Sequence, residues 1–286
     1  MSNLNEYFYG TQNAYFDDPK FISSDAKYHE NKLKYVRTVE ESYDCLNKVF
    51  YTFPKLDNKN QVYKQIRICS ETRLDNMQYS LDSCGSTIDY VYSPILGILR
   101  RIYKIEDKTV IPFYFCSENN YLPYSEYRCL IQNYDSNIEG TMTIFVDIYE
   151  YDDANSQNES LNYLSKGIQF TGEEPISDCV EKVRLNFNHL ITHIFVNHAD
   201  NINKLTLFFR KRLSEPEKYL EIDLSNLTII NNHIIVPIDN INFTTCDNIV
   251  LSLSFNNKTN GKLFIYGLYL QAVRYENERL GLQFSK

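Results

Sequence analysis

The sequence predicts an all-β protein, and three features of its 286 residues favour that fold class. First, 14% of the residues are aromatic, with 24 Tyr, 17 Phe and no Trp, and they stand among many Ile, Val and Thr. Such residues suit the pleated, half-buried surface of a β-sheet. Second, short runs alternate between apolar and polar side chains. Third, no helix-period pattern is sustained long enough to indicate a helical bundle.

Short runs of β-branched or aromatic residues, bounded by Asn, Asp, Gly or Pro, are the expected strands. They are 48–53, 62–68, 141–149, 204–209, 233–238, 248–255 and 262–273. In the run 248–255, Val250, Ser252 and Ser254 alternate with apolar residues, so one face lies in a core and the other meets polar surroundings. Little room is left for crossover helices, which favours a β-sandwich or barrel. Short helices are expected near 93–104 and 159–167.

The length of the chain fits two compact units of about 140 residues each. The most polar interruption is 150–160, which follows a strong predicted strand. We therefore predict an N-terminal unit over 1–160, a linker over 161–180 and a C-terminal unit over 181–286.

The composition argues against several classes of protein. The formal net charge of −8 and the pI near 5.2 disfavour a broad nucleic-acid-binding face. The seven cysteines show no CxxC spacing, so neither a zinc ribbon nor a disulfide framework is indicated, and a reducing compartment fits best. The N-terminus does not resemble a signal peptide and no run of 18 apolar residues occurs, so the protein is expected to be cytosolic when made.

The stretch RLNFNHLITHIFVNHAD, 184–200, holds three of the five histidines and raises the question of a metal site. His189 and His193 are four residues apart and would share one face of a helix, but the β-branched and aromatic residues between them favour a strand. On that strand His193 would lie with Ile191 and Phe195, whereas His189 and His198 stand at the entry and exit. Histidines in these positions do not converge on one ion, so no metal site is expected.

Catalytic motifs are also missing from the sequence. It contains no GxSxG, GxGxxG or GxxxxGK[ST] motif, and paired carboxylates such as Glu173 and Glu174 lie in polar segments typical of a solvated surface. We expect no enzymatic activity and no cofactor. The aromatic clusters at 5–10 and 90–94 suit a sugar-stacking platform, but packing in a core or a subunit interface is favoured.

Several segments, in the same order along the chain, resemble the double jelly-roll major capsid proteins of nucleocytoplasmic large DNA viruses. They are 9–32, 110–132, 142–153, 167–174 with 183–196, and the ending 268–286. In the first segment the matching residues are Gly10, Gln12 and Pro19. The most specific match is QFTG, 169–172, followed by LNFNH, 185–189.

The resemblance implies structural roles for a set of motif residues. They are Pro112, Phe113, Leu122, Pro123, Phe170, Gly172, Asn186, Phe187, Asn188 and His189. In the family the Asn-Phe-Asn-His run marks a turn into a strand, where Asn and His bond to local backbone groups. The family usually has proline after this histidine, whereas this chain has Leu190.

The resemblance implies two tandem antiparallel eight-stranded jelly rolls with few short helices. It also implies a viral structural protein that forms homotrimeric, pseudo-hexagonal capsomers of an icosahedral capsid. The expected partners are other copies of the chain, neighbouring capsomers, minor capsid proteins and an inner membrane layer, with no direct contact to nucleic acid. The expected location is the virion, after assembly in the host cytoplasm.

The chain is shorter than typical family members, which implies a compact capsid protein or a minor-capsid paralogue, and residues 1–20 are expected to order on assembly. Three alternatives stay open. One is an assembly scaffold related to capsid proteins, and another is a carbohydrate-binding β-sandwich module. The third is a cupin-like metalloenzyme, which needs His189, His193, His198 or His233 to converge with a carboxylate.

Overall fold

The computed structural model describes residues 33–45, 48–70, 76–117, 120–134, 140–151, 161–211, 214–238, 241–257, 261–276 and 278–282. Its chain divides into two compact units. The first jelly roll comprises the described residues of 33–167 together with 272–282, and the second comprises those of 168–271. The segments 5–10 and 9–32, with Gly10, Gln12 and Pro19, lie outside the described residues.

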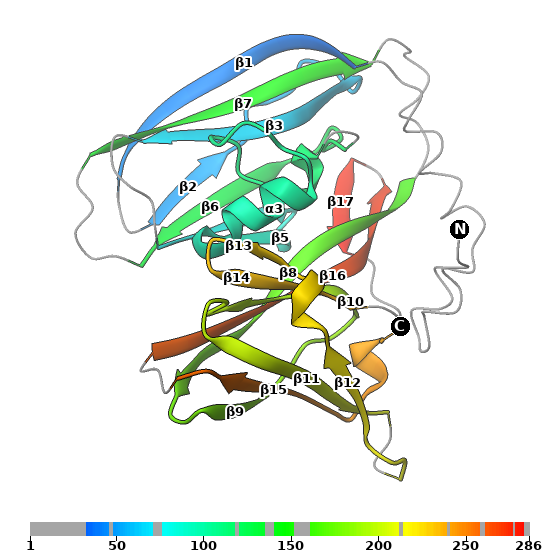
Figure 1. Ribbon diagram of the computed structural model, residues 1–286. Helices are drawn as coiled ribbons and strands as arrows, with labels where there is room; N and C mark the ends of the chain where they lie inside the picture. Colours follow the sequence, from blue (N-terminus) through cyan, green and yellow to red (C-terminus); the bar gives the residue numbers. More distant parts are fainter. Residues whose placement is uncertain are drawn as a thin grey trace. The chain divides into compact units, whose positions relative to one another are not determined.

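The first jelly roll is built from two antiparallel sheets (Figure 1). One sheet has the order β1-β7-β3 and the other the order β2-β6-β4-β5. The strands are β1 (Leu33–Asp44), β2 (Lys48–Thr52), β3 (Gln61–Ser70), β4 (Met77–Ser83), β5 (Ser86–Tyr92), β6 (Tyr127–Asn133) and β7 (Thr141–Tyr151). The segment 110–122 adds isolated bridges to β3, from Val110 to Arg67 and from Leu122 to Tyr63.

The second jelly roll has the same pattern. Its sheets are β13-β14-β10-β16, with β8 also pairing β16, and β12-β11-β15-β9. The strands are β8 (Leu161–Ile176), β9 (Val180–Arg184), β10 (Leu190–Asn197), β11 (Ile202–Arg210), β12 (Lys218–Ile222), β13 (Thr228–Ile230), β14 (His233–Pro237), β15 (Asn248–Phe255) and β16 (Gly261–Glu276). β17 (Arg279–Leu282) pairs with the end of β16 and belongs to the first jelly roll.

The strand order identifies both units as jelly rolls. In the second unit, β8 pairs with β16, β16 with β10, and β10 with β14. Across this sheet the order is therefore the first, the last, the third and the sixth strand of the barrel. The facing sheet joins the second, seventh, fourth and fifth strands, β9-β15-β11-β12. β1-β7-β3 and β2-β6-β4-β5 repeat this order, with 110–122 in the place of the sixth strand. Two Greek keys that share two sheets define this topology.

Among the described residues the helical elements are few and short. They are η2 (Ser93–Ile95), α3 (Leu96–Ile102), η3 (Tyr114–Cys116), η4 (Leu224–Asn226) and η5 (Phe243–Thr245). The helix expected near 93–104 is therefore confirmed as η2 and α3. α3 buries Ile98 and Leu99. Arg100 and Arg101 lie in its last turn, where positive charge interacts favourably with the helix dipole. No helix among the described residues is long and apolar enough to cross a membrane.

All of the strands expected from alternation are present, as β2, β3, β7, β11, β14, β15 and β16. In β15 the burial alternates residue by residue, with Leu251 and Leu253 in the core and Ser252 and Ser254 half-buried on the other face. The core of the second jelly roll is mainly aliphatic, with Phe187, Phe243 and Phe255 among its buried residues. That of the first contains the fully buried aromatic residues Tyr51, Tyr63 and Phe113.

The prediction for 161–180 is wrong. The segment expected to hold a short helix and a linker forms β8, which pairs with β16, and the described residues 161–167 belong to the first jelly roll. Pairing with β16 satisfies the backbone of this segment as a strand. The C-terminal boundary also differs, because 272–282 group with the first jelly roll.

One side-chain assignment in β10 is also wrong. Ile191 was expected to share a face with His193, but it lies in the core with Ile194 and Val196. The register against β16 shifts between Ile191 and His193, so a β-bulge turns the residues before it to the opposite face.

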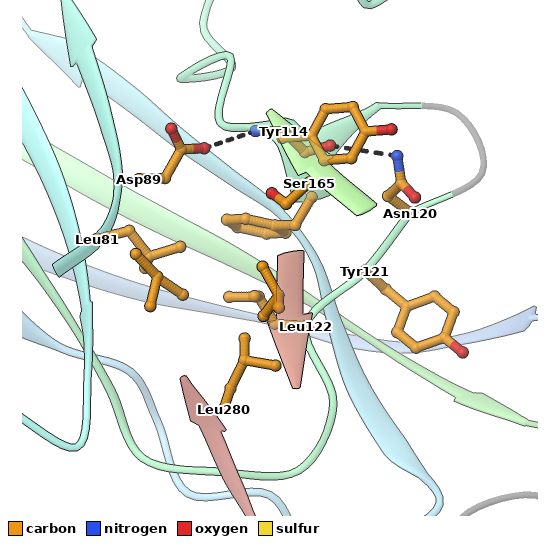
Figure 2. A pocket seen from close by; sticks show the side chains of 11 residues that line it. Leu81, Asp89, Tyr114, Asn120, Tyr121, Leu122, Ser165 and Leu280 are labelled. Carbon is orange, nitrogen blue, oxygen red and sulfur yellow. Dashed lines mark hydrogen bonds between the residues drawn. The ribbon is translucent and has the colours of Figure 1, made fainter. Parts of the chain in front are cut away.

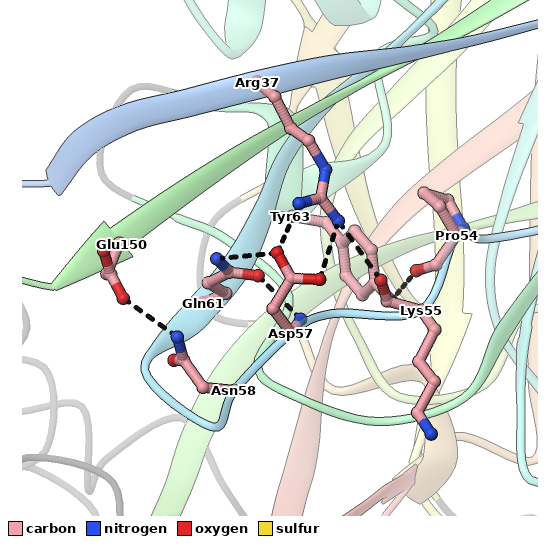
Figure 3. Close-up of polar contacts among 8 residues, drawn as sticks. All are labelled: Arg37, Pro54, Lys55, Asp57, Asn58, Gln61, Tyr63 and Glu150. Atoms are coloured by element: carbon pink, nitrogen blue, oxygen red, sulfur yellow. Dashed lines mark hydrogen bonds and ion pairs between the residues drawn. The ribbon is translucent and has the colours of Figure 1, made fainter.

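Polar contacts tie the loop between β2 and β3 to neighbouring strands (Figure 3). Arg37 on β1 forms an ion pair with Asp57, whose backbone N–H donates to Gln61 Oε1 at 2.8 Å. Asn58 Nδ2 donates to Glu150 Oε1 at 3.1 Å. The Arg37 and Asp57 side chains are 38% and 58% exposed, so their ion pair orients the loop more than it stabilises the fold.

Candidate functional site

The most specific motif of the sequence comes together in the second jelly roll. QFTG lies on β8, and LNFNH forms the loop between β9 and β10. The backbone N–H of Asn188 donates to Gln169 Oε1 at 2.8 Å, which connects the two halves of the motif directly. Asn186 and Asn188 are exposed. The motif therefore fixes a loop between strands and contributes no internal binding site.

Phe187 anchors this loop in the core. It is only 4% exposed and its ring lies 6.2 Å from that of Phe243. Gly267 on β16 accommodates the ring, because a Cβ at this position would come within 2.9 Å of the Phe187 ring carbons. A glycine in the middle of a strand normally weakens it, and here the close approach of a ring explains its presence.

His189 stands in the left-handed region of the backbone, with φ of +73°. Its N–H donates to Thr244 Oγ1 at 2.7 Å and its carbonyl accepts from the N–H of Phe243 at 3.1 Å. The imidazole stacks on Tyr269 at a centroid distance of 5.0 Å, and burial lowers the pKa of His189. A neutral, stacked ring in a turn suits a structural role.

Phe170 and Gly172 lie on β8, which pairs with β16. The Phe170 ring stacks on Tyr266 at 4.7 Å and on Phe264 at 6.2 Å. Gly172 has φ of +106°, a conformation that only glycine adopts without strain. At the start of β16, Lys262 forms an ion pair with Glu173.

The motif residues of the first jelly roll lie in the segment 110–122 and just after it. Pro112, Phe113, Leu122 and Pro123 are all buried. The segment 110–122 bridges β3 only at its two ends and forms η3 between them. Pro112 has no N–H to donate to a ladder, which explains why the pairing is interrupted.

Phe113 is fully buried and stacks on Phe115 at 6.1 Å. Phe115 in turn lies 6.5 Å from Phe53, whose ring also approaches Tyr63 at 5.0 Å and Tyr127 at 5.9 Å. Edge-to-face pairs of this kind add stability beyond the buried area. The aromatic residues of this segment thus pack in a core.

A small cavity of about 20 Å³ lies beside this segment (Figure 2). Asp89, Asn120 and Ser165 contribute its polar wall, and Leu122 and Leu280 are among its apolar residues. The space is about that of one water molecule, which is too small for a substrate.

Asp89 is the unexpected residue of this cavity. It lies on β5, fully buried, and its carboxyl accepts the backbone N–H groups of Tyr90 and Tyr114, each at 2.8 Å. Burial raises the pKa of Asp89 to about 8, although the two N–H donors act in the opposite direction. The burial of Asp89 was not predicted, because a single Asp within a strand does not show from the local sequence that its carboxyl lies in a core.

The histidines occupy separate environments. His193 Nδ1 lies 3.1 Å from Thr192 Oγ1, and His198 Nε2 lies 3.0 Å from the carbonyl of Lys262. His233 Nδ1 lies 2.8 Å from the carbonyl of Asn231. Within the residues that the structure describes, no group of three His, Cys, Asp or Glu side chains is placed to hold a metal ion.

The two units thus define the class of fold as a double jelly roll, in which the same eight-strand pattern occurs twice in one chain. No family model and no curated protein sequence matches the chain. Solved structures with the same fold are found among viral capsid proteins.

VP54 of PBCV-1, fitted into a reconstruction of the virophage Sputnik, has a TM-score of 0.61 and 15% identity, covering 88% of this chain and 98% of that one. The major capsid protein P2 of bacteriophage PM2 gives 0.52 and 9%, covering 86% and 98%. The MCP of Sulfolobus turreted icosahedral virus gives 0.51 and 12%, also covering 86% and 98%. The likeness extends across both jelly rolls and establishes the fold.

Proposed function

We propose that this chain is a capsid protein of the double jelly-roll family and builds the shell of a large DNA virus. The observation that carries the proposal is the repeated strand order, which the chain shares over most of its length with capsid proteins of PBCV-1, PM2 and Sulfolobus turreted icosahedral virus. The motif residues support it by holding loops and cores in place, from Phe113 in the first unit to His189 in the second.

The proposed assembly unit is a homotrimer. Two similar barrels per chain make three chains a pseudo-hexagon, and hexagonal units tile a facet of an icosahedral shell. A closed ring of identical subunits is the usual form of such an assembly. The proposed partners are neighbouring capsomers, minor capsid proteins and an inner membrane layer, within a virion assembled in the host cytoplasm.

The charge of the chain supports a shell that does not touch nucleic acid directly. A net charge of −8 repels phosphate, and packaged DNA would therefore be held behind other layers. A structural role, and not a catalytic one, also agrees with a one-water cavity and a loop motif that is engaged in packing.

The solution mass of the purified full chain tests this proposal. Light scattering is expected to give a stable trimer of about 101 kDa, from three chains of 33.8 kDa. A stable monomer at micromolar concentration would contradict the capsomer. A trimer that is absent from the completed shell would instead favour the assembly scaffold.

A further inference from the structure

The outward face of the sheet β12-β11-β15-β9 in the second jelly roll carries a groove of about 430 Å³. Its walls and floor come from three neighbouring strands. The lining residues are Lys204, Thr206, Phe208, Tyr219, Glu221, Ser252 and Ser254. The volume lies within the range of about 300–1,000 Å³ that is typical of small-molecule sites.

The groove follows from the order of side chains along the strands. Leu205 and Leu207 of β11 are fully buried on the core face, so Lys204, Thr206 and Phe208 point outward. Thr206 is paired with Ser252, and Lys204 is paired with Ser254 on β15. Small hydroxyl side chains thus form a floor between larger residues.

Two aromatic rings stand at one end of this floor. Phe208 and Tyr219 are paired across β11 and β12, and their ring centroids lie 6.3 Å apart at 41°. Tyr219 is 70% exposed. An exposed ring beside a groove offers a flat, apolar surface to a ligand, and the hydroxyl group of Tyr219 adds a polar edge.

The charges that line the groove balance each other. Lys204 Nζ lies 3.0 Å from Glu221 Oε1, with both side chains more than half exposed. The lining residues therefore carry no net charge, but they present an ammonium donor, a carboxylate acceptor and four hydroxyl groups that both donate and accept.

We propose that this groove binds a short neutral saccharide. The C–H face of a sugar ring would stack on Tyr219 and Phe208, and its hydroxyl groups would bond to Thr206, Ser252 and the Lys204–Glu221 pair. A second copy of the chain is a less suitable occupant, since the core of a protein interface is depleted of charged residues. The proposal does not depend on the capsid role.

Binding of neutral oligosaccharides to the full chain tests this inference. Cellopentaose, maltopentaose and mannotriose are titrated by calorimetry and by saturation-transfer NMR, with sialyllactose as the anionic comparison. At least one neutral sugar is expected to bind. Tyr219→Ala is expected to weaken that binding by roughly tenfold, which corresponds to about 1.4 kcal/mol.

Two further variants make the result specific. Thr206→Val keeps the shape of the floor and removes one hydroxyl group, so it is also expected to weaken binding. Phe50→Ala removes a ring that is 60% exposed on the first jelly roll and is expected to leave binding unchanged. Because Tyr219 is exposed, the Tyr219→Ala variant is expected to keep the wild-type thermal unfolding profile.

Three results would overturn the inference. They are the absence of binding by any neutral sugar at millimolar concentration, binding by sialyllactose alone, and binding that Tyr219→Ala and Thr206→Val leave intact. A change of oligomeric mass in Tyr219→Ala, without an effect on sugar binding, would assign the groove to contact between copies of the chain.

Discussion

Phe187 and Gly267 illustrate how a single residue pair decides the path of a loop. The sequence motif identified Phe187 from its place between two asparagines, but it gave no indication that Gly267, far along the chain, makes room for the ring. Their contact belongs to tertiary packing, which local patterns do not encode. His189, in contrast, stands in the kind of turn that its neighbours predict.

Replacement of Gly267 by alanine tests this packing. The added Cβ would meet the Phe187 ring at 2.9 Å, and a buried ring has little room to shift. We expect Gly267→Ala to lower the free energy of unfolding by about 1–3 kcal/mol in chemical denaturation. Gly281→Ala is the matched control, because nothing lies within 4 Å of its Cβ. Equal effects of the two changes would refute the account.

Asp89 gives a prediction for the effect of pH. With its pKa raised to about 8, the folded chain holds a proton on Asp89 that the unfolded chain releases above about pH 4. The stabilising contribution of protonated Asp89 is fully present below the pKa that Asp89 has in the unfolded chain. It is lost as the pH rises through the pKa of Asp89 in the folded chain. Asp89→Asn keeps a neutral side chain at every pH, so the decline in stability between about pH 4 and pH 8 should be smaller in this variant.

Denaturant titrations at a series of pH values, with wild type and Asp89→Asn compared at each, isolate this residue from other titrating groups. Parallel curves for the two proteins would show that Asp89 is ionised in the folded state.

At the scale of elements, alternation predicted strands well and boundaries poorly. β11 and β15 follow from the period of two in their sequences. β8 was predicted as a linker after the polar segment 150–160, since its pairing with β16, which begins about a hundred residues later, does not show in the local sequence. The bulge in β10 likewise depends on the register with β16 and not on local sequence. Pairing between distant strands therefore accounts for what the patterns could not supply.

The hairpin formed by the end of β16, from residue 272, and β17 belongs to the first jelly roll although it lies at the other end of the sequence. Tyr275 Oη donates to the carbonyl of Tyr124 at 2.8 Å, and Leu280, which is 2% exposed, lines the cavity beside Asp89. The hairpin thus completes the core of a unit whose other strands precede it by more than a hundred residues.

Leu280→Ala should therefore destabilise the first jelly roll. Loss of the buried side chain enlarges the cavity, and we expect a cost of about 2–5 kcal/mol in the free energy of unfolding. Arg279→Ala, at an exposed neighbouring position, serves as the control and should have little effect. Hydrogen exchange at β4 and β5 would locate the change, and unaltered protection there would contradict the assignment of the hairpin to this unit.

At the scale of the whole molecule, the all-β class follows from composition and alternation, and the double jelly roll was expected from the resemblance of QFTG and LNFNH to the capsid family. The groove on β11, β12 and β15 was not predicted. Its residues alternate as the sequence indicates, but only the register across three strands shows that Thr206 lies beside Ser252 and Phe208 beside Tyr219.

Electron microscopy of the purified protein tests the central claim most directly. If two jelly rolls per chain build a pseudo-hexagonal capsomer, particles from the peak of trimeric mass should show a hexagonal outline with threefold symmetry. Single chains, or rings with a different number of subunits, would contradict the proposed role in a capsid.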